Sequence, residues 1–148
     1  MATFEKKFLI QVPSSTDNLV LIREFVSGIG GQAGLDPSEI GRLELAVDEA
    51  CANVIEHAYR HDRTREFVVR AAFDEQALRI VVEDTGVGFD PASAPGVPLN
   101  QLIAERRSGG LGLELIRKIM DEVHYEMDPG RKNELSMVMR IKRALPAQ

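Results

Sequence analysis

Glu49 and Asn53 are the two side chains of this sequence with the clearest potential for chemistry. They stand four residues apart in a stretch with helical periodicity, so both project from one face of a helix, one turn apart. An asparagine carbonyl oxygen suits Mg²⁺ when phosphates and water supply the remaining ligands. A glutamate in the same space can orient or deprotonate a hydroxyl group or a water molecule. The pair predicts metal-assisted acid–base chemistry, and a solvated polar helix face is the alternative.

A second group follows a nearly continuous apolar run from Leu78 to Val82. Asp84 comes just after this run, and Gly86 and Gly88 follow it at alternate positions. An ionised aspartate only accepts hydrogen bonds, so at the end of a buried strand it favours a ligand amino group, such as that of adenine. The two glycines would let a flat ring approach the backbone. A tight turn explains the same residues equally well.

A third group is the glycine-rich segment at residues 109–112, which opens a helix. Bare backbone N–H groups and the positive end of the helix dipole bind phosphate without any lysine. Arg106 and Arg107, just before this segment, are candidates for pairing with a terminal phosphate. A flexible hinge with solvated arginines is the alternative.

The elements that must position these groups can be read from the apolar pattern. Asp36, Pro37 and Glu39 form an N-cap, a first-turn proline and a capping-box acid, so a helix is predicted from about residue 37 to about residue 60. Its buried stripe has three-and-four spacing, with Ile40, Leu43, Val47, Ala50 and Val54. An earlier helix carries Leu19, Ile22, Phe25 or Val26, and Ile29, and the glycines at 28, 30, 31 and 34 are expected to end it.

Alternating apolar residues predict strands, and the chain order predicts the fold class. The expected strands cover residues 4–12, 66–73, 77–83, 123–127 and 135–141, and a further helix follows the glycines at 109–112. Residues 91–108 form a long connection of the kind that is usually functional or disordered. The order β-α-α-β-β-loop-α-β-β predicts an α+β two-layer sandwich, in which a mixed, mainly antiparallel sheet has helices on one face.

Composition limits the classes of protein. The 148 residues are 44% hydrophobic and 28% charged, so we expect one soluble domain over residues 1–148. The net charge of -5 argues against direct nucleic-acid binding. Cys51, the single cysteine, is expected to be a small buried hydrophobe, and no apolar run reaches the roughly 18 residues of a membrane span. No apolar leader follows the first charges, so the expected location is cytoplasmic and away from membranes.

Three segments also carry a resemblance to a known family. The stretch E-A-C-A-N-V-I-E-H-A-Y resembles the N box, D-T-G-V-G-F the G1 box and G-G-L-G-L-E-L-I the G2 box of the GHKL (Bergerat-fold) ATP-binding superfamily. More closely, the whole chain is similar to the bacterial anti-sigma-factor serine/threonine kinases. The three boxes occur in the family's order, which makes the resemblance specific.

The resemblance implies a role for each matched residue. Glu49 would be the catalytic base for an acceptor serine, and Asn53 would hold Mg²⁺. Asp84 would bind adenine N6. Residues 91–108 would be the ATP lid. The remaining nucleotide-binding residues would be Gly86 and Gly88 beside the base, Gly110, Leu111 and Gly112 under the phosphates, and Arg107 or Arg106 as the lid arginine. His57 matches a position near the phosphates, or it fixes the helix end.

The same resemblance implies ATP and Mg²⁺ as cofactors and a regulatory role. The chain would sequester a sigma factor and phosphorylate a serine on a STAS-domain anti-anti-sigma protein. A homodimer is expected on the same basis. The alternative is a nucleotide-binding partner-switch module that acts on another regulator without kinase turnover.

Overall fold

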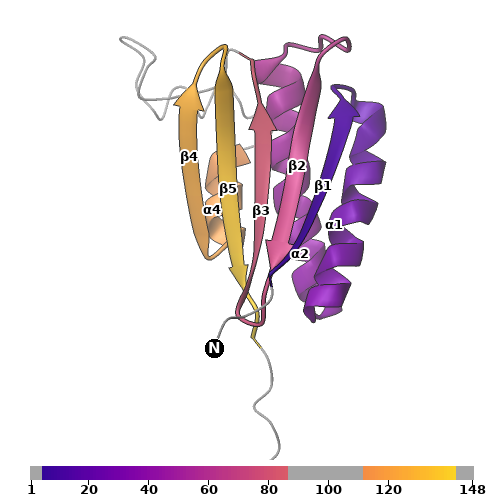
Figure 1. Cartoon of the computed structure of the whole chain (residues 1–148), viewed down its shortest axis with the longest axis vertical. Helices are drawn as coiled ribbons and strands as arrows, with labels where there is room; N and C mark the ends of the chain where they lie inside the picture. Colours follow the sequence, from indigo (N-terminus) through magenta and orange to yellow (C-terminus); the bar gives the residue numbers. More distant parts are fainter. Residues whose placement is uncertain (1–4, 87–111, 143–148) are drawn as a thin grey trace, which may run out of the picture.

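The computed structural model of the chain describes residues 5–86 and 112–142 (Figure 1). The order of the elements is the predicted one, with a 3-10 turn before the first helix and a π-helix after the second. In chain order they are β1 (Lys6–Pro13), η1 (Thr16–Asn18), α1 (Leu19–Ala33), α2 (Pro37–Asn53), η2 (Val54–Ala58), β2 (Glu66–Phe73), β3 (Ala77–Asp84), α4 (Gly112–Ile119), β4 (Glu122–Asp128) and β5 (Lys132–Arg140).

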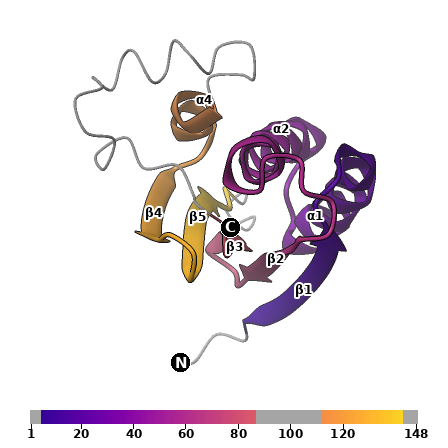
Figure 2. The same cartoon turned by 90° about the horizontal axis from the view of Figure 1, so that it is seen from above.

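The strands form one five-stranded sheet in the order β1-β2-β3-β5-β4. Each neighbouring pair is antiparallel. Figure 2 shows α1, α2 and α4 on one side of this curved sheet, with α2 between the other two helices. The arrangement confirms the predicted α+β sandwich with helices on one face.

The core lies between the two layers and follows the period-two alternation of the strands. Ala71, Ile80 and Met137 are register partners on β2, β3 and β5, and all three are buried. The helices contribute a complementary set of fully buried side chains: Ile22, Val26, Leu43, Ala46 and Val47. One continuous apolar core therefore fixes α2 against the centre of the sheet.

Helix α2 begins where the sequence predicts. Glu39 N donates to Asp36 Oδ1 over 2.8 Å, and Asp36 N donates to Glu39 Oε1 over 3.0 Å, which is a complete capping box. Of the four glycines expected to end α1, only Gly34 does so. The helix continues through Gly28, Gly30 and Gly31 and ends only at Gly34, whose φ of 95° is left-handed.

Helix packing explains the glycine at position 30. A Cβ there would lie 3.3 Å from Ile40 Cγ1 and 3.4 Å from a Leu43 methyl carbon. The missing side chain lets α1 approach α2 closely, so the glycine supports helix packing instead of ending the helix.

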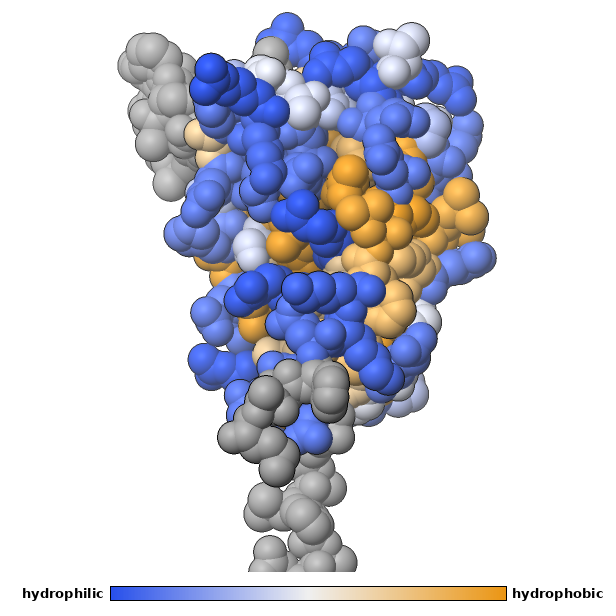
Figure 3. Space-filling model, viewed as in Figure 1, coloured by the Kyte–Doolittle hydropathy of each residue, from blue (hydrophilic) through white to orange (hydrophobic). Residues whose placement is uncertain are grey.

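The outer face of the sheet carries an apolar area among hydrophilic residues, which Figure 3 shows. Leu9 of β1, 58% exposed, belongs to this face, and its register partner is Arg70 of β2. Across residues 5–86 and 112–142, every helix falls short of the length and hydropathy that crossing a membrane requires.

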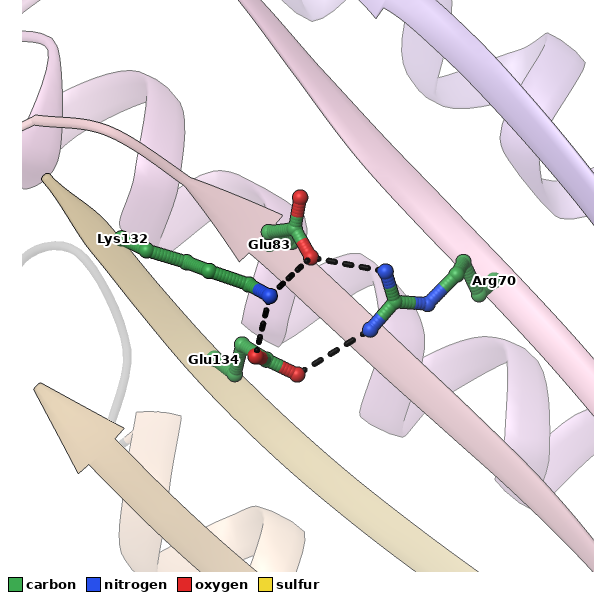
Figure 4. A network of polar contacts seen from close by, with 4 residues as sticks. All are labelled: Arg70, Glu83, Lys132 and Glu134. Carbon is green, nitrogen blue, oxygen red and sulfur yellow. Dashed lines mark hydrogen bonds and ion pairs between the residues drawn. The ribbon is translucent and has the colours of Figure 1, made fainter.

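A network of four charged side chains spans β2, β3 and β5 on this outer face (Figure 4). Arg70 Nη1 lies 2.8 Å from Glu83 Oε1, and Arg70 Nη2 lies 3.0 Å from Glu134 Oε2. Lys132 Nζ reaches the same two glutamates over 3.7 and 3.0 Å. Glu83 and Glu134 are register partners, and such like charges repel unless cations bridge them. The network therefore holds together the ends of β3 and β5. Asp84 directly follows Glu83 on β3, and Asn133 directly precedes Glu134 on β5.

Candidate functional site

The end of α2 lies behind the end of β3 in Figure 1. Residues of both elements line a small pocket. Asn53 and Asp84, from two of the three predicted groups, both line it. Its other lining residues are mostly apolar: Ala50, Val54, Ala58, Val82, Tyr125 and Leu135. An apolar pocket with few polar groups is the usual form of a small-molecule site.

Glu49 lies one helical turn before Asn53 on α2 and is half-buried. Asn53 is also half-buried at the last position of the helix. In residues 5–86 and 112–142, no three His, Cys, Asp or Glu side chains are grouped as metal ligands. Asn53 offers one neutral carbonyl oxygen, so a cation there would take most of its ligands from phosphate and water, which fits the preference of Mg²⁺.

Asp84 is 4% exposed and tightly held. Its Oδ1 accepts hydrogen bonds from Gly86 N over 2.8 Å and from Asn133 Nδ2 over 2.9 Å. Burial raises the pKa of the Asp84 carboxyl, and the hydrogen bonds from Asn133 and Gly86 and the positive charge of Arg65 oppose that rise. The residue is thus a buried carboxylate acceptor at a strand end, as the sequence predicts.

The end of α2 differs from the prediction of one helix to about residue 60. The α-helix stops at Asn53 and the chain continues as the π-helix η2, in which Tyr59 N donates to Val54 O over 2.9 Å. Arg60 and His61 then adopt left-handed conformations with φ of 49° and 64°. Such π turns are rare and often mark functional sites, and this one starts next to Asn53.

Tyr59, at the end of η2, connects the helical layer to the loop after β3. Its hydroxyl donates to Glu66 O over 2.7 Å and accepts from Thr85 N over 2.9 Å. The guanidinium of Arg65 lies 4.5 Å from the centre of the Tyr59 ring and donates to Thr85 O and Oγ1. These contacts hold the backbone between Asp84 and Gly86 in one position.

A packing contact explains why position 86 is glycine, and this explanation differs from the predicted one. A Cβ there would lie 2.3 Å from Ala58 O and 2.9 Å from Tyr59 Cδ1. The end of η2 thus occupies the space that a side chain would need, so glycine is required for helix packing whether or not a ring approaches.

Some of the remaining predicted site residues lie within the described residues, and others lie outside them. Gly88, Arg106, Arg107, Gly110, Leu111 and the lid at 91–108 lie outside the described residues. Gly112 is the first residue of α4, which packs on α2 (Figure 2). His57 is half-buried on η2, and its Nε2 lies 3.9 Å from Glu56 Oε2. Cys51 is fully buried, and burial raises the pKa of its thiol, so it is the predicted small hydrophobe.

Two residues of the site were missed by sequence reasoning: Tyr59 and Asn133. Asn133 lies at an inward position of β5, two residues before Leu135, so strand alternation alone places a polar side chain in the core. That mismatch was a usable signal. Tyr59 is the last residue of the stretch that resembles the N box, but its role could not be predicted because its two hydroxyl contacts depend on how η2 ends.

Comparison with known proteins now adds to this geometry. The model of the histidine kinase-like ATPase domain family matches residues 12–139. The serine-protein kinase RsbW of Bacillus licheniformis is 37% identical over 123 residues, which cover 80% of this chain and 76% of that protein. The serine-protein kinase RsbW of Bacillus subtilis (strain 168) is 33% identical over 126 residues, with 82% and 78% covered.

Two solved structures share the fold. The RsbU and RsbW domains of a Mycobacterium tuberculosis protein align with a TM-score of 0.67 at 19% identity, covering 94% of this chain and 33% of that chain. The SiaB–SiaC complex from Pseudomonas aeruginosa aligns with a TM-score of 0.62 at 16% identity, covering 89% and 88%. The family model and the relatives confirm the predicted superfamily. This chain therefore belongs to the histidine kinase-like ATPase domain family.

Proposed function

We propose that this chain is an ATP-dependent protein serine kinase that acts as an anti-sigma factor. The observation that carries the proposal is the pocket that Asn53 and Asp84 line together, at the junction of α2 and β3. Kinship with serine-protein kinases supports ATP use and phosphoryl transfer to serine. The chain functions as one ATP-binding domain in the cytoplasm.

Different residues of the site bind the two ends of the nucleotide, the adenine base and the phosphates. Asp84 accepts a hydrogen bond from the adenine amino group, and Gly86 lies beside the base. Asn53 would hold Mg²⁺, which would supply charge neutralisation at the phosphates. The phosphates rest on the backbone N–H groups at the start of α4, where the helix dipole is positive. The remaining contacts are assigned to Gly88, Arg107, Gly110, Leu111 and Gly112.

Glu49 acts on the protein substrate. Its carboxylate takes the proton of the acceptor serine as the serine oxygen bonds to the γ-phosphorus. The bond from that phosphorus to the bridging oxygen breaks, and ADP leaves. Most of the rate comes from positioning and charge neutralisation, which a rigid helix can provide.

The regulatory partners follow from the same family. The chain sequesters a sigma factor, and a STAS-domain anti-anti-sigma protein supplies the acceptor serine and is inactivated by phosphorylation. The kinase forms a homodimer, without direct binding to nucleic acid or membrane. Light scattering at micromolar concentration tests the dimer, and a monomer there would contradict it.

Mass spectrometry of the STAS protein after incubation with the chain and Mg-ATP tests the activity. We expect one phosphoserine. Glu49→Gln should slow its appearance roughly 10²- to 10⁴-fold while nucleotide still binds. The matched control is Glu44→Gln, which changes a half-buried glutamate of the same helix. Nucleotide binding without phosphoserine in the wild type would favour a partner switch without turnover.

A further inference from the structure

Asn133 is the most deeply buried polar side chain next to the pocket. It is 0% exposed and sits opposite Asp84 in the pairing of β3 with β5. Its Nδ2 donates to Asp84 Oδ1 over 2.9 Å and to Gly86 O over 3.0 Å. Its Oδ1 accepts from Asp128 N over 3.1 Å. One side chain thus bridges β3, the loop after it and the β4–β5 turn.

The orientation of this amide follows from its partners. The backbone N–H of Asp128 can only donate, so the atom facing it is the amide oxygen. The NH₂ group then points at two acceptors, the Asp84 carboxylate and the Gly86 carbonyl. Gly130 N donates to the same Gly86 carbonyl over 2.8 Å, which reinforces the contact between the turn and the loop.

We propose that Asn133 is a positioning residue of the nucleotide site, whose amide fixes the Asp84 carboxylate and the Gly86 backbone for recognition of the adenine amino group. The inference rests on the proposed function. It adds a residue outside the three sequence motifs and assigns it a specific task. A donor to Oδ1 keeps Asp84 an ionised acceptor in one orientation, so the ligand meets an acceptor that needs no reorganisation.

The charged groups around Asp84 influence the pH at which its carboxyl is protonated. Arg65, from the turn after η2, favours the ionised carboxylate, and Glu83, its neighbour on β3, disfavours it. Of the residues that line the pocket, β4 contributes Tyr125 and α2 contributes the neutral Asn53. The Asn133 amide, the Gly86 N–H and Arg65 are therefore the described groups that oppose protonation of this buried carboxyl.

Asn133→Asp is the sharpest test, because it keeps the size of the side chain and an oxygen for Asp128 N. When protonated, Asp at 133 still donates one hydrogen bond to Asp84. When both groups are ionised, two carboxylates face each other at the 2.9 Å of the present hydrogen bond and repel. ADP affinity of this variant should therefore rise, by about tenfold or more, as the pH falls from about 8.5 to about 6.

The wild type should respond in the opposite direction. Its ADP affinity is flat at alkaline pH and decreases on acidification, as Asp84 becomes protonated. Asn133→Leu, which offers no donor at any pH, should bind ADP about tenfold more weakly throughout, with no recovery in acid. Ser136→Ala, a change on the outer face of the same strand, should match the wild type.

Isothermal titration calorimetry with ADP and Mg²⁺, at several pH values, separates the outcomes. Acid recovery in Asn133→Asp alone supports the positioning role. Equal pH profiles in Asn133→Asp and Asn133→Leu would mean that Asn133 only anchors the hairpin, and would overturn the inference. If the wild type binds no ADP at any pH, the proposed function fails instead.

A second measurement needs no variant of Asn133. In the ¹⁵N spectrum of the wild type, the side-chain amide of Asn133 should shift along with the titration of Asp84. An amide resonance that stays constant through that titration would overturn the inference, even if Asn133→Asp does not fold.

Discussion

The hydroxyl group of Tyr59 accepts a hydrogen bond from the backbone N–H of Thr85 over 2.9 Å. Tyr59 ends the π-helix that follows Asn53, and Thr85 follows Asp84. This one contact therefore couples the residue proposed to hold Mg²⁺ to the residue proposed to bind adenine, across the boundary between helices and sheet.

Tyr59→Phe is expected to loosen that coupling. It removes the hydrogen bonds to Thr85 N and Glu66 O from a side chain that is 4% exposed. The free energy of unfolding should fall by about 1–2 kcal/mol. ADP affinity should fall several-fold, measured by calorimetry. Equal ADP affinity and equal stability in Tyr59→Phe and the wild type would contradict the role of the tyrosine.

Glycine at position 86 is expected to be required for stability even without nucleotide. Gly86→Ala places a Cβ 2.3 Å from Ala58 O, so the loop or the end of η2 must shift. Unfolding free energy should drop by about 3 kcal/mol in denaturant titrations. Gly41→Ala, in the open on α2, should instead raise it by about 0.5–1 kcal/mol. An unchanged stability in Gly86→Ala would refute the packing explanation.

The order of the elements could be predicted because each one carries its own local signal. The capping box at Asp36 and Glu39 fixed the start of α2, and alternation located β2 at residues 66–73. The site roles of Asn53 and Asp84 stay predictions, and the structure places both residues on the wall of one pocket.

The incorrect or missing predictions concern features that depend on tertiary contacts. The glycines at 28, 30 and 31 lie inside α1, since close packing on α2 outweighs their weak helix propensity. The change from α to π winding after Asn53 leaves no trace in the apolar period. Neither the role of Gly86 beside Ala58 nor that of Asn133 beside Asp84 is visible without the neighbouring strand and helix end.

Asn53→Ala should remove the metal-dependent part of nucleotide binding. The Asn53 side chain and Asp84 line the same pocket. The amide oxygen of Asn53 is the protein ligand that we propose for Mg²⁺. ADP affinity of the variant with Mg²⁺ should equal that of the wild type in excess EDTA. Adding EDTA to the variant should then change nothing. A variant that still responds to Mg²⁺ as the wild type does would exclude Asn53 as a ligand.

The Asp84 carboxyl is expected to lower the stability at neutral pH, because burial raises its pKa above the ordinary value of 3.8. The folded state then holds the proton more tightly than the unfolded state. Unfolding free energy therefore decreases as the pH rises from 3.8 through the folded-state pKa, and is constant above it. Asp84→Asn should be more stable than the wild type at neutral pH, with a gap that narrows toward pH 3.8 in thermal melts. A less stable variant would contradict the sign.

Calorimetric titration of ADP with Mg²⁺ into the wild type and into Asp84→Asn tests the central proposal most directly. Asparagine at position 84 keeps an oxygen for Gly86 N and Asn133 Nδ2 but loses the ionised acceptor. A nucleotide site formed by α2 and β3 requires binding in the wild type and a loss of about tenfold or more in the variant. No heat with the wild type, or equal affinity in both proteins, would contradict it.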